Sequence, residues 1–216
     1  MVADGLGGHR GGADASRAAA DALMDAYASA LDAAMTPLEQ HARALVDAAD
    51  VAVKDAQRRC TNDDMRTTLA VLVVDDGDAV WSHVGDSRIY RFRGGRIVDQ
   101  TSDHSVPQLL VRTGEITADE VRHHPERSRL LRALGQPEPP RPTVAARTPV
   151  MPGDAFLLCS DGWWELVLEA EMEDDLAASC GDPTAWIARM AERIRERAPT
   201  DHDNYSAVGV SAMEGA

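Results

Sequence analysis

The 216-residue sequence predicts an α+β fold built on antiparallel strands. Alanine and leucine recur at helical spacing over residues 13–60, which predicts helices there. From residue 67 the pattern changes to short apolar strands, and Asp75-Asp76-Gly77-Asp78 and Gly94-Gly95 are typical of hairpin turns. Because hairpins join antiparallel neighbours, the pattern argues against a parallel sheet of alternating strands and helices.

Composition excludes several classes of partner. The chain has a length that fits one domain, residues 1–216. Its 36 acidic and 22 basic side chains give a net charge of -14, which argues against nucleic acid as the main partner. Cys60, Cys159 and Cys180 form no paired motif, which favours reduced thiols in the cytoplasm. No apolar run approaches the roughly 20 residues of a membrane span, so no membrane partner is expected. We expect a cytoplasmic monomer.

The first dozen residues combine a short apolar run, Asp4 and a turn dense in glycine. Glycines let a ligand approach the main chain, and a carboxylate followed by bare backbone carbonyls offers hard oxygen ligands to a divalent cation. The same residues also fit an ordinary strand-to-helix turn capped by Asp4. Two helices are expected to follow, separated at Thr36-Pro37, where Thr36 suits the N-cap and Pro37 the first helical position.

The strands between residues 67 and 98 are predicted to form an antiparallel meander. Residues 67–74 form a β-branched run expected to be covered on both faces, and residues 79–84 return from the turn. Gly85-Asp86 then interrupts the pattern without the form of a two-residue hairpin, so Asp86 could point off the end of the sheet. Residues 89–93 and 96–98 complete the meander.

Residues 101–135 read as a loop, a short helix over 106–113 and a further helix start at 117–120. His123-His124 is a weak metal signal, because neighbours in a helix point in different directions. The arginines that follow make a basic patch in an acidic protein, and we interpret it as a flap facing an anionic substrate, although a solvated surface is the default.

The C-terminal third contains a second apolar run that ends in Asp-Gly, like the one that ends at Asp4-Gly5. Residues 155–159 are expected to form a buried strand that ends at Ser160-Asp161-Gly162, with Cys159 inert in its apolar surroundings. Another strand is expected over 144–150, a helical turn at 176–178, a helix over 186–197 and a last strand over 205–210, with Trp163 and Trp164 serving as packing. Asp203 stands just before that last strand.

Four aspartates thus lie at strand ends or starts: Asp4, Asp86, Asp161 and Asp203. Carboxylates that converge without cations repel one another, whereas Mg²⁺ or Mn²⁺ would stabilise them. Two such ions about 3.5–4 Å apart can hold a bridging water and stabilise a phosphoryl transition state. The residues therefore favour metal-assisted hydrolysis of a phosphate ester.

A series of motifs resembles, in order, that of the PPM family, the type-2C metal-dependent serine/threonine protein phosphatases, in a compact bacterial form. The motifs are Val2-Ala3-Asp4-Gly5-Leu6-Gly7-Gly8-His9, Thr67-Thr68-Leu69, Val84-Gly85-Asp86-Ser87-Arg88, Asp103-His104-Ser105, Leu131-Arg132-Ala133-Leu134-Gly135, Leu158-Cys159-Ser160-Asp161-Gly162 and Asp203-Asn204-Tyr205-Ser206-Ala207-Val208. The resemblance implies a four-layer α-β-β-α sandwich, with a metal site at one edge and a flap at about 101–130. It also implies a phosphoprotein substrate made by a serine/threonine kinase.

The resemblance assigns roles to single positions. It implies that Asp4 bridges two core Mg²⁺ or Mn²⁺ ions and that the Gly5 carbonyl binds one of them. Asp161 and Asp203 match the other core ligands, and Asp86 matches the residue that, with Asp161, holds a third and weaker ion.

Two further positions beside these ligands take roles from the resemblance. Asn204 is expected to orient the site. His9 is a candidate general acid, although Leu6 stands where the animal-type pattern has its histidine.

The sequence also departs from the family pattern. The family's N-terminal strand pair, with its phosphate-binding arginine and acidic pair, has no counterpart before Val2. Arg66 replaces a small residue before Thr67, where it could compensate for that arginine. The expected function is metal-dependent hydrolysis of phosphoserine and phosphothreonine by a water that bridges two ions. The alternative is a pseudophosphatase that acts as a regulatory binding module.

Overall fold

The computed structural model describes residues 1–6, 8–30, 36–60, 62, 64–199 and 202–213, without the side chains of residues 8–10 and 30. Within these ranges no helix has the apolar length that a bilayer crossing requires. The helices are α1 (Gly8–Ala30), α2 (Leu38–Cys60), α3 (Val106–Thr113), the 3-10 helix η1 (Ala118–His123), α4 (Asp161–Trp164), α5 (Glu169–Ala178) and α6 (Pro183–Arg197). The strands are β1 (Gly5–Leu6), β2 (Arg66–Thr67), β3 (Leu69–Asp75), β4 (Asp78–Val84), β5 (Arg88–Arg93), β6 (Arg96–Gln100), β7 (Thr143–Val144), β8 (Thr148–Pro149), β9 (Ala155–Cys159) and β10 (Ala207–Ser211).

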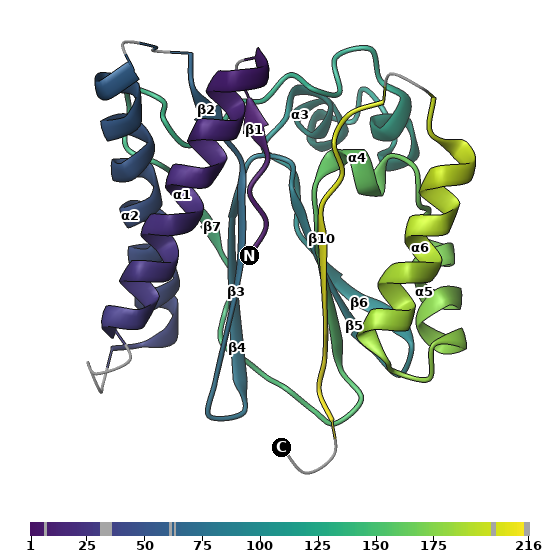
Figure 1. Ribbon diagram of the computed structural model, residues 1–216. Helices are drawn as coiled ribbons and strands as arrows, with labels where there is room; N and C mark the ends of the chain where they lie inside the picture. Colours follow the sequence, from purple (N-terminus) through teal and green to yellow (C-terminus); the bar gives the residue numbers. More distant parts are fainter. Residues whose placement is uncertain (7, 31–35, 61, 63, 200–201, 214–216) are drawn as a thin grey trace.

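Two antiparallel sheets lie face to face between two pairs of helices (Figure 1). The first sheet has the order β3-β4-β7, with β8 also paired to β4, and the second has the order β10-β9-β5-β6. Helices α1 and α2 cover the outer face of the first sheet, and α5 and α6 cover that of the second (Figure 1). The predicted α+β sandwich of four layers is therefore confirmed.

Buried apolar side chains fill the spaces between the layers. Between the two sheets, Trp81 of β4 meets Phe156 of β9, with ring centroids 6.0 Å apart. Between the second sheet and its helices, Trp186 of α6 packs edge-on against Phe92 of β5, with centroids 5.0 Å apart. Burying a large apolar side chain contributes about 1.5–3 kcal/mol. These contacts hold the layers in register, and with them the strand ends.

Helix α1 begins at Gly8, whereas the sequence predicted a turn as far as residue 12. Close packing explains the difference. A Cβ on Gly12 would lie 2.6 Å from the Gly5 carbonyl oxygen, and one on Gly5 would lie 2.1 Å from the Gly12 oxygen. These glycines let the first turns of α1 lie directly against the main chain that follows Asp4.

Helix α2 begins at Leu38, one residue after the predicted start at Pro37. The Pro37 carbonyl accepts a hydrogen bond from the His41 amide at 3.0 Å, as an N-cap residue does. Further along the helix, the buried Asp50 accepts a bond from the Gly135 amide at 2.9 Å. Helix α2 therefore fixes a distant loop as well as its own sheet.

The chain crosses from the first sheet to the second at residues 85–87, and the prediction of one continuous meander was wrong. Both predicted hairpins are present, with turns at Asp76-Gly77 and Gly94-Gly95 that have positive φ angles. Gly85 has φ +101°, and a Cβ there would lie 2.7 Å from Thr68 Cγ2. A glycine is therefore required at the crossing, which carries Asp86 between the sheets.

The C-terminal third follows the predicted order with different bounds. The expected strand over 144–150 is two short pieces, because β7 and β8 pair only with the two ends of β4. Helix α5 is longer than the turn predicted at 176–178, and α6 begins at Pro183 because Asp182 caps it by accepting a bond from the Thr184 amide at 2.9 Å. Strand β10 begins two residues after the predicted start.

Residues 101–135 connect the second sheet to the first. The predicted helix over 106–113 is confirmed, with Ser105 as its N-cap and Gly114 in the left-handed conformation at its end. The helix start at 117–120 is the 3-10 helix η1. The segment closes on itself where the Leu131 amide donates to the His104 carbonyl at 2.7 Å.

Candidate metal centre

Asp4 is held by its main chain against the start of β3. Its amide donates to Thr68 Oγ1 at 3.0 Å. Its carbonyl accepts from the Thr68 amide and from Thr67 Oγ1, each at 2.8 Å. Just before it, Val2 exchanges two hydrogen bonds with Ala70 of β3, each 2.8 Å long. The position of the Asp4 carboxylate is therefore set by strand pairing rather than by a free terminus.

A cavity of about 410 Å³ opens beside Asp4 and is lined by residues from near both ends of the chain. Its lining is Ala3, Asp4, Gly5, Gly12, Ala13, Ser16, Asp203, Asn204 and Ser206. Two of the four predicted carboxylates, and the carbonyl-bearing Gly5, thus share one space at one end of the sandwich.

Asp161 and Asp203 are brought together by the pairing of β9 with β10. Beyond the last pair of these strands, Ser160 and Ser206 exchange bonds through the Ser160 amide and hydroxyl, at 3.0 and 3.1 Å. The main chain then approaches so closely that a Cβ on Gly162 would lie 2.4 Å from the Asn204 carbonyl oxygen. The Asp-Gly dipeptide at 161–162 is therefore required by tertiary contact, and not only by a local turn.

Each of these two carboxylates is oriented by the amide of the next residue. The Gly162 amide donates to Asp161 Oδ1 at 2.7 Å, and the Asn204 amide donates to Asp203 Oδ1 at 2.8 Å. The expectation that Asn204 orients the site stays a prediction. With one oxygen of each carboxylate fixed, the direction of the other is fixed too.

The pKa values of Asp4 and Asp161 are raised by burial and by neighbouring carboxylates. Burial raises the pKa of Asp4 to about 8, and the charges of Asp161 and Asp203 add to it. Burial also raises the pKa of Asp161, and the Asp203 charge contributes. Carboxylates that repel one another in this way are the arrangement that a cation stabilises.

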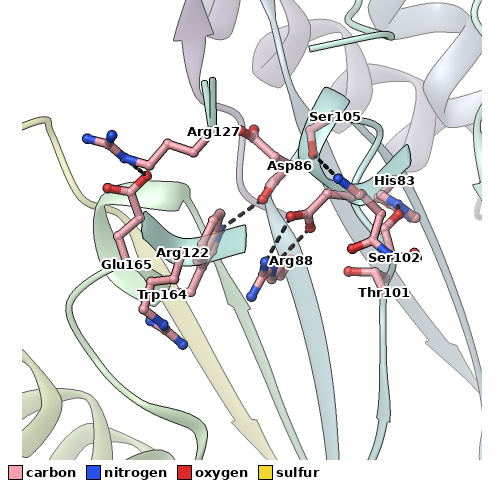
Figure 2. Close-up of polar contacts among 12 residues, drawn as sticks. His83, Asp86, Arg88, Thr101, Ser102, Ser105, Arg122, Arg127, Trp164 and Glu165 are labelled. Atoms are coloured by element: carbon pink, nitrogen blue, oxygen red, sulfur yellow. Dashed lines mark hydrogen bonds and ion pairs between the residues drawn. The ribbon is translucent and has the colours of Figure 1, made fainter. Parts of the chain in front are cut away.

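Asp86 belongs to the same group but is more deeply buried, with 4% of its surface exposed. Burial raises its pKa well above the usual range, followed by the charges of Asp161, Asp103 and Asp4. Its carbonyl accepts a hydrogen bond from Trp164 Nε1 at 2.9 Å (Figure 2). The structure thus brings Asp86 into the charge environment of Asp161, as the sequence predicted.

A buried ion pair lies next to residues 85–87, the crossing between the sheets that carries Asp86. Arg88 binds both carboxylate oxygens of Asp103, at 2.9 and 2.8 Å, and its guanidinium lies 3.5 Å from the ring centroid of Trp164 (Figure 2). Trp164, expected only to pack, therefore also binds the crossing. Its indole N–H was the available signal, because a buried tryptophan N–H requires an acceptor.

The donors fit a hard divalent cation. They are the carboxylates of Asp4, Asp161 and Asp203 and the Gly5 carbonyl, with Asp86 beside them, and all are oxygen atoms, as Mg²⁺ and Mn²⁺ prefer. Within the described ranges, no three His, Cys, Asp or Glu side chains are close enough to hold an ion by themselves. Such an ion would therefore complete its shell with water, which is usual for Mg²⁺.

Two other expectations meet different outcomes. The side chain of His9 lies outside the described residues, so its role as general acid stays a prediction. Cys159 is fully buried, as predicted, and burial raises the pKa of its thiol, which disfavours the thiolate that a nucleophile requires.

Three of the four arginines of residues 122–132 pair with acidic groups, and the fourth, Arg132, lies against His104 and donates to the Arg141 carbonyl at 3.0 Å. Arg122 binds Glu169 at 2.7 Å. Arg127 binds Glu165 at 2.8 Å (Figure 2). Glu165 follows Asp161 by four residues on the α4 turn, and its amide donates to the Asp161 carbonyl at 2.9 Å. This link between residues 101–130 and the turn that carries Asp161 was not predicted, because it depends on which segments lie opposite each other.

Comparison with known proteins decides the family. The family model described as protein phosphatase 2C matches residues 1–201. The chain belongs to the protein phosphatase 2C family. It is 37% identical over 182 residues to the serine/threonine phosphatase stp of Listeria welshimeri, an alignment that covers 82% of this chain and 70% of that one.

Solved structures agree with this assignment to the 2C-type phosphatases. The Mycobacterium tuberculosis serine/threonine phosphatase PstP/Ppp matches with a TM-score of 0.81 and 30% identity, over 98% of this chain and 86% of that one. A catalytic domain of PstP in complex with two manganese ions matches with a TM-score of 0.76 and 28% identity, over 97% and 86% of the two chains. The phosphatase family and its dependence on divalent metal therefore account for the oxygen donors described above.

Proposed function

We propose that this phosphatase hydrolyses phosphoserine and phosphothreonine esters on proteins with two divalent cations, Mn²⁺ or Mg²⁺. Asp4 would bridge the two ions, and the Gly5 carbonyl, Asp161 and Asp203 would complete the protein ligands. The observation that carries the proposal is the cavity that Asp4, Gly5 and Asp203 share, where burial and the charges of Asp161 and Asp203 raise the pKa of Asp4 to about 8.

The chain's own residues supply position and charge. When bound, two such cations lower the pKa of a water and stabilise the charge of a phosphoryl group in its transition state. The Gly162 and Asn204 amides hold one oxygen of Asp161 and one of Asp203, so that neither carboxylate needs to reorient during the reaction. Asp86, with Asp161, would hold a third and weaker ion.

The substrate would reach this centre past residues 101–130, which we propose act as a flap. The Arg127–Glu165 ion pair links that segment to the turn that carries Asp161. Movement of the flap would therefore act on a metal ligand. The proposed substrate is a phosphoprotein made by a serine/threonine kinase, and the enzyme would act as a monomer.

The proposal is tested with a phosphothreonine peptide and Mn²⁺, together with calorimetric titration of Mn²⁺. We expect EDTA to abolish turnover, and Asp161→Asn to abolish turnover and weaken Mn²⁺ binding. The matched control is Asp21→Asn, which removes the same charge from the exposed face of α1 and should change neither. If Asp161→Asn kept both turnover and Mn²⁺ affinity, the proposal would be wrong.

Together with the turnover assay, the Mn²⁺ titration also distinguishes an active phosphatase from a pseudophosphatase that only binds partners. A protein that binds Mn²⁺ through Asp161 but turns over no phosphopeptide would be the pseudophosphatase. The enzyme is expected to show both properties in one preparation.

A further inference from the structure

Thr68 occupies the break between β2 and β3 and is fully buried. Its hydroxyl accepts the Asp4 amide proton at 3.0 Å, and its own amide donates back to the Asp4 carbonyl at 2.8 Å. The Thr68 hydroxyl and the Thr68 amide thus both hydrogen-bond to the backbone of Asp4.

The same hydroxyl also reaches the crossing that carries Asp86. Thr68 Oγ1 lies 2.6 Å from Ser87 Oγ, and both residues have no exposed surface. On the other side of Asp86, the Thr68 methyl group covers Gly85 so closely that a Cβ there would lie 2.7 Å from it. Thr68 therefore contacts the residues on both sides of Asp86.

We propose that Thr68 is a positioning residue, whose hydroxyl fixes Asp4 and Asp86 relative to each other and so couples the two places where these carboxylates bind cations. The inference rests on the proposed function, because it takes Asp4 and Asp86 as metal ligands. Asp4 stands beside β1 and Asp86 at the β4–β5 crossing, and the Thr68 hydroxyl bonds to both segments. Buried groups that orient metal ligands in this way tune metal affinity.

The hydroxyl can be removed without removing the strand. In Thr68→Val the side chain keeps its shape, and the Asp4 carbonyl keeps its bonds from the Thr68 amide and Thr67 Oγ1. We expect Thr68→Val to weaken Mn²⁺ affinity, measured by calorimetry, by about 10- to 100-fold, which is typical when a partner of a metal ligand is lost. Thr68→Ser keeps the hydroxyl and should restore affinity close to that of the unaltered protein.

Ser87→Ala removes the other end of the same hydrogen bond. If the Thr68–Ser87 contact carries the coupling, the losses in Thr68→Val and Ser87→Ala will not add in the double variant. Additive losses would show that the two residues act separately, and would overturn the inference. Ser87→Ala also provides the measurement if Thr68→Val fails to fold.

A matched control separates positioning from general loosening of the fold. Thr101 is also buried, and its hydroxyl accepts the Ile89 amide proton at 3.0 Å. Thr101→Val should therefore lower the melting temperature but leave Mn²⁺ affinity and the Mn²⁺-induced rise in melting temperature unchanged. An equal loss of Mn²⁺ affinity in Thr101→Val would overturn the inference.

The two proposals fail in different ways. Unchanged Mn²⁺ affinity in Thr68→Val, with loss of affinity in Asp161→Asn, would reject the role of Thr68 and leave the metal centre intact. Retained Mn²⁺ affinity in Asp161→Asn would reject the metal centre itself.

Discussion

Gly162 offers the most direct test of how closely the segments that carry Asp161 and Asp203 must approach each other. A Cβ in Gly162→Ala would lie 2.4 Å from the Asn204 carbonyl oxygen, where ordinary contact begins at 3.4 Å. Because that oxygen belongs to the main chain, no side chain can turn away, and the segment after Asp203 must move by about 1 Å relative to Asp161. A misplacement of about 1 Å can cost a factor of about 100 in rate, or about 3 kcal/mol of transition-state stabilisation.

The assay is kcat/KM on a phosphothreonine peptide at saturating Mn²⁺, with circular dichroism to confirm folding. The control is Gly209→Ala in β10, whose Cβ would meet Ile187 side-chain atoms at 3.2 and 3.4 Å, which can yield. Gly162→Ala should lose activity about 100-fold, and Gly209→Ala should stay near that of the unaltered protein. If Gly162→Ala were as active as the unaltered protein, the close approach at Gly162 would not be what sets the geometry of the centre.

Two further predictions concern buried ion pairs of residues that are not proposed metal ligands. Burial raises the pKa of Asp154, but hydrogen bonds from Arg93 and Arg91 outweigh it and lower that pKa to about 2. Since this lies below the ordinary value of 3.8, the stabilisation is complete above pH 4 and lost as the pH falls to 2. Asp154→Asn should therefore lower the free energy of unfolding in urea by about 2 kcal/mol at pH 7 and by little at pH 2, and an equal loss at both would contradict this. Asp103→Asn removes the bidentate partner of the buried Arg88 and leaves it the more distant Glu169 at 3.6 Å, so it should cost about 3–5 kcal/mol in the same assay. Glu126→Gln breaks the exposed pair with Arg129 and should cost less than about 1 kcal/mol, so similar losses in the two variants would refute the role of burial.

Much of the local structure was predictable because its signals are local. The hairpin turn at Asp76-Gly77, the Ser105 cap of α3 and the buried strand before Asp161 each depend on a few neighbouring residues. The errors arose where distant contacts decide. Gly12 is helical because it packs on Gly5, and the expected meander is divided because the chain turns from one sheet to the other at the crossing before Asp86.

The residues of the proposed metal centre divide in the same way. Asp4, Asp161 and Asp203 could be named from the sequence, because an aspartate at the end of a strand is visible as a pattern. The roles of Thr68, Trp164 and the Arg127–Glu165 pair could not, because each depends on which segment lies opposite. A buried tryptophan N–H or threonine hydroxyl indicates that a hydrogen-bond partner is needed, but not which residue supplies it.

The sequence by itself determined the class of secondary structure, the proposed carboxylate donors and the family resemblance, since these depend on residue identity and spacing along the chain. Only the tertiary structure decided that the crossing at Gly85 carries Asp86 to the other aspartates, and that Gly162 lies against Asn204. The physical reason is that close packing and mutual electrostatic repulsion act between residues far apart in the sequence, and they exist only after the two sheets have come together.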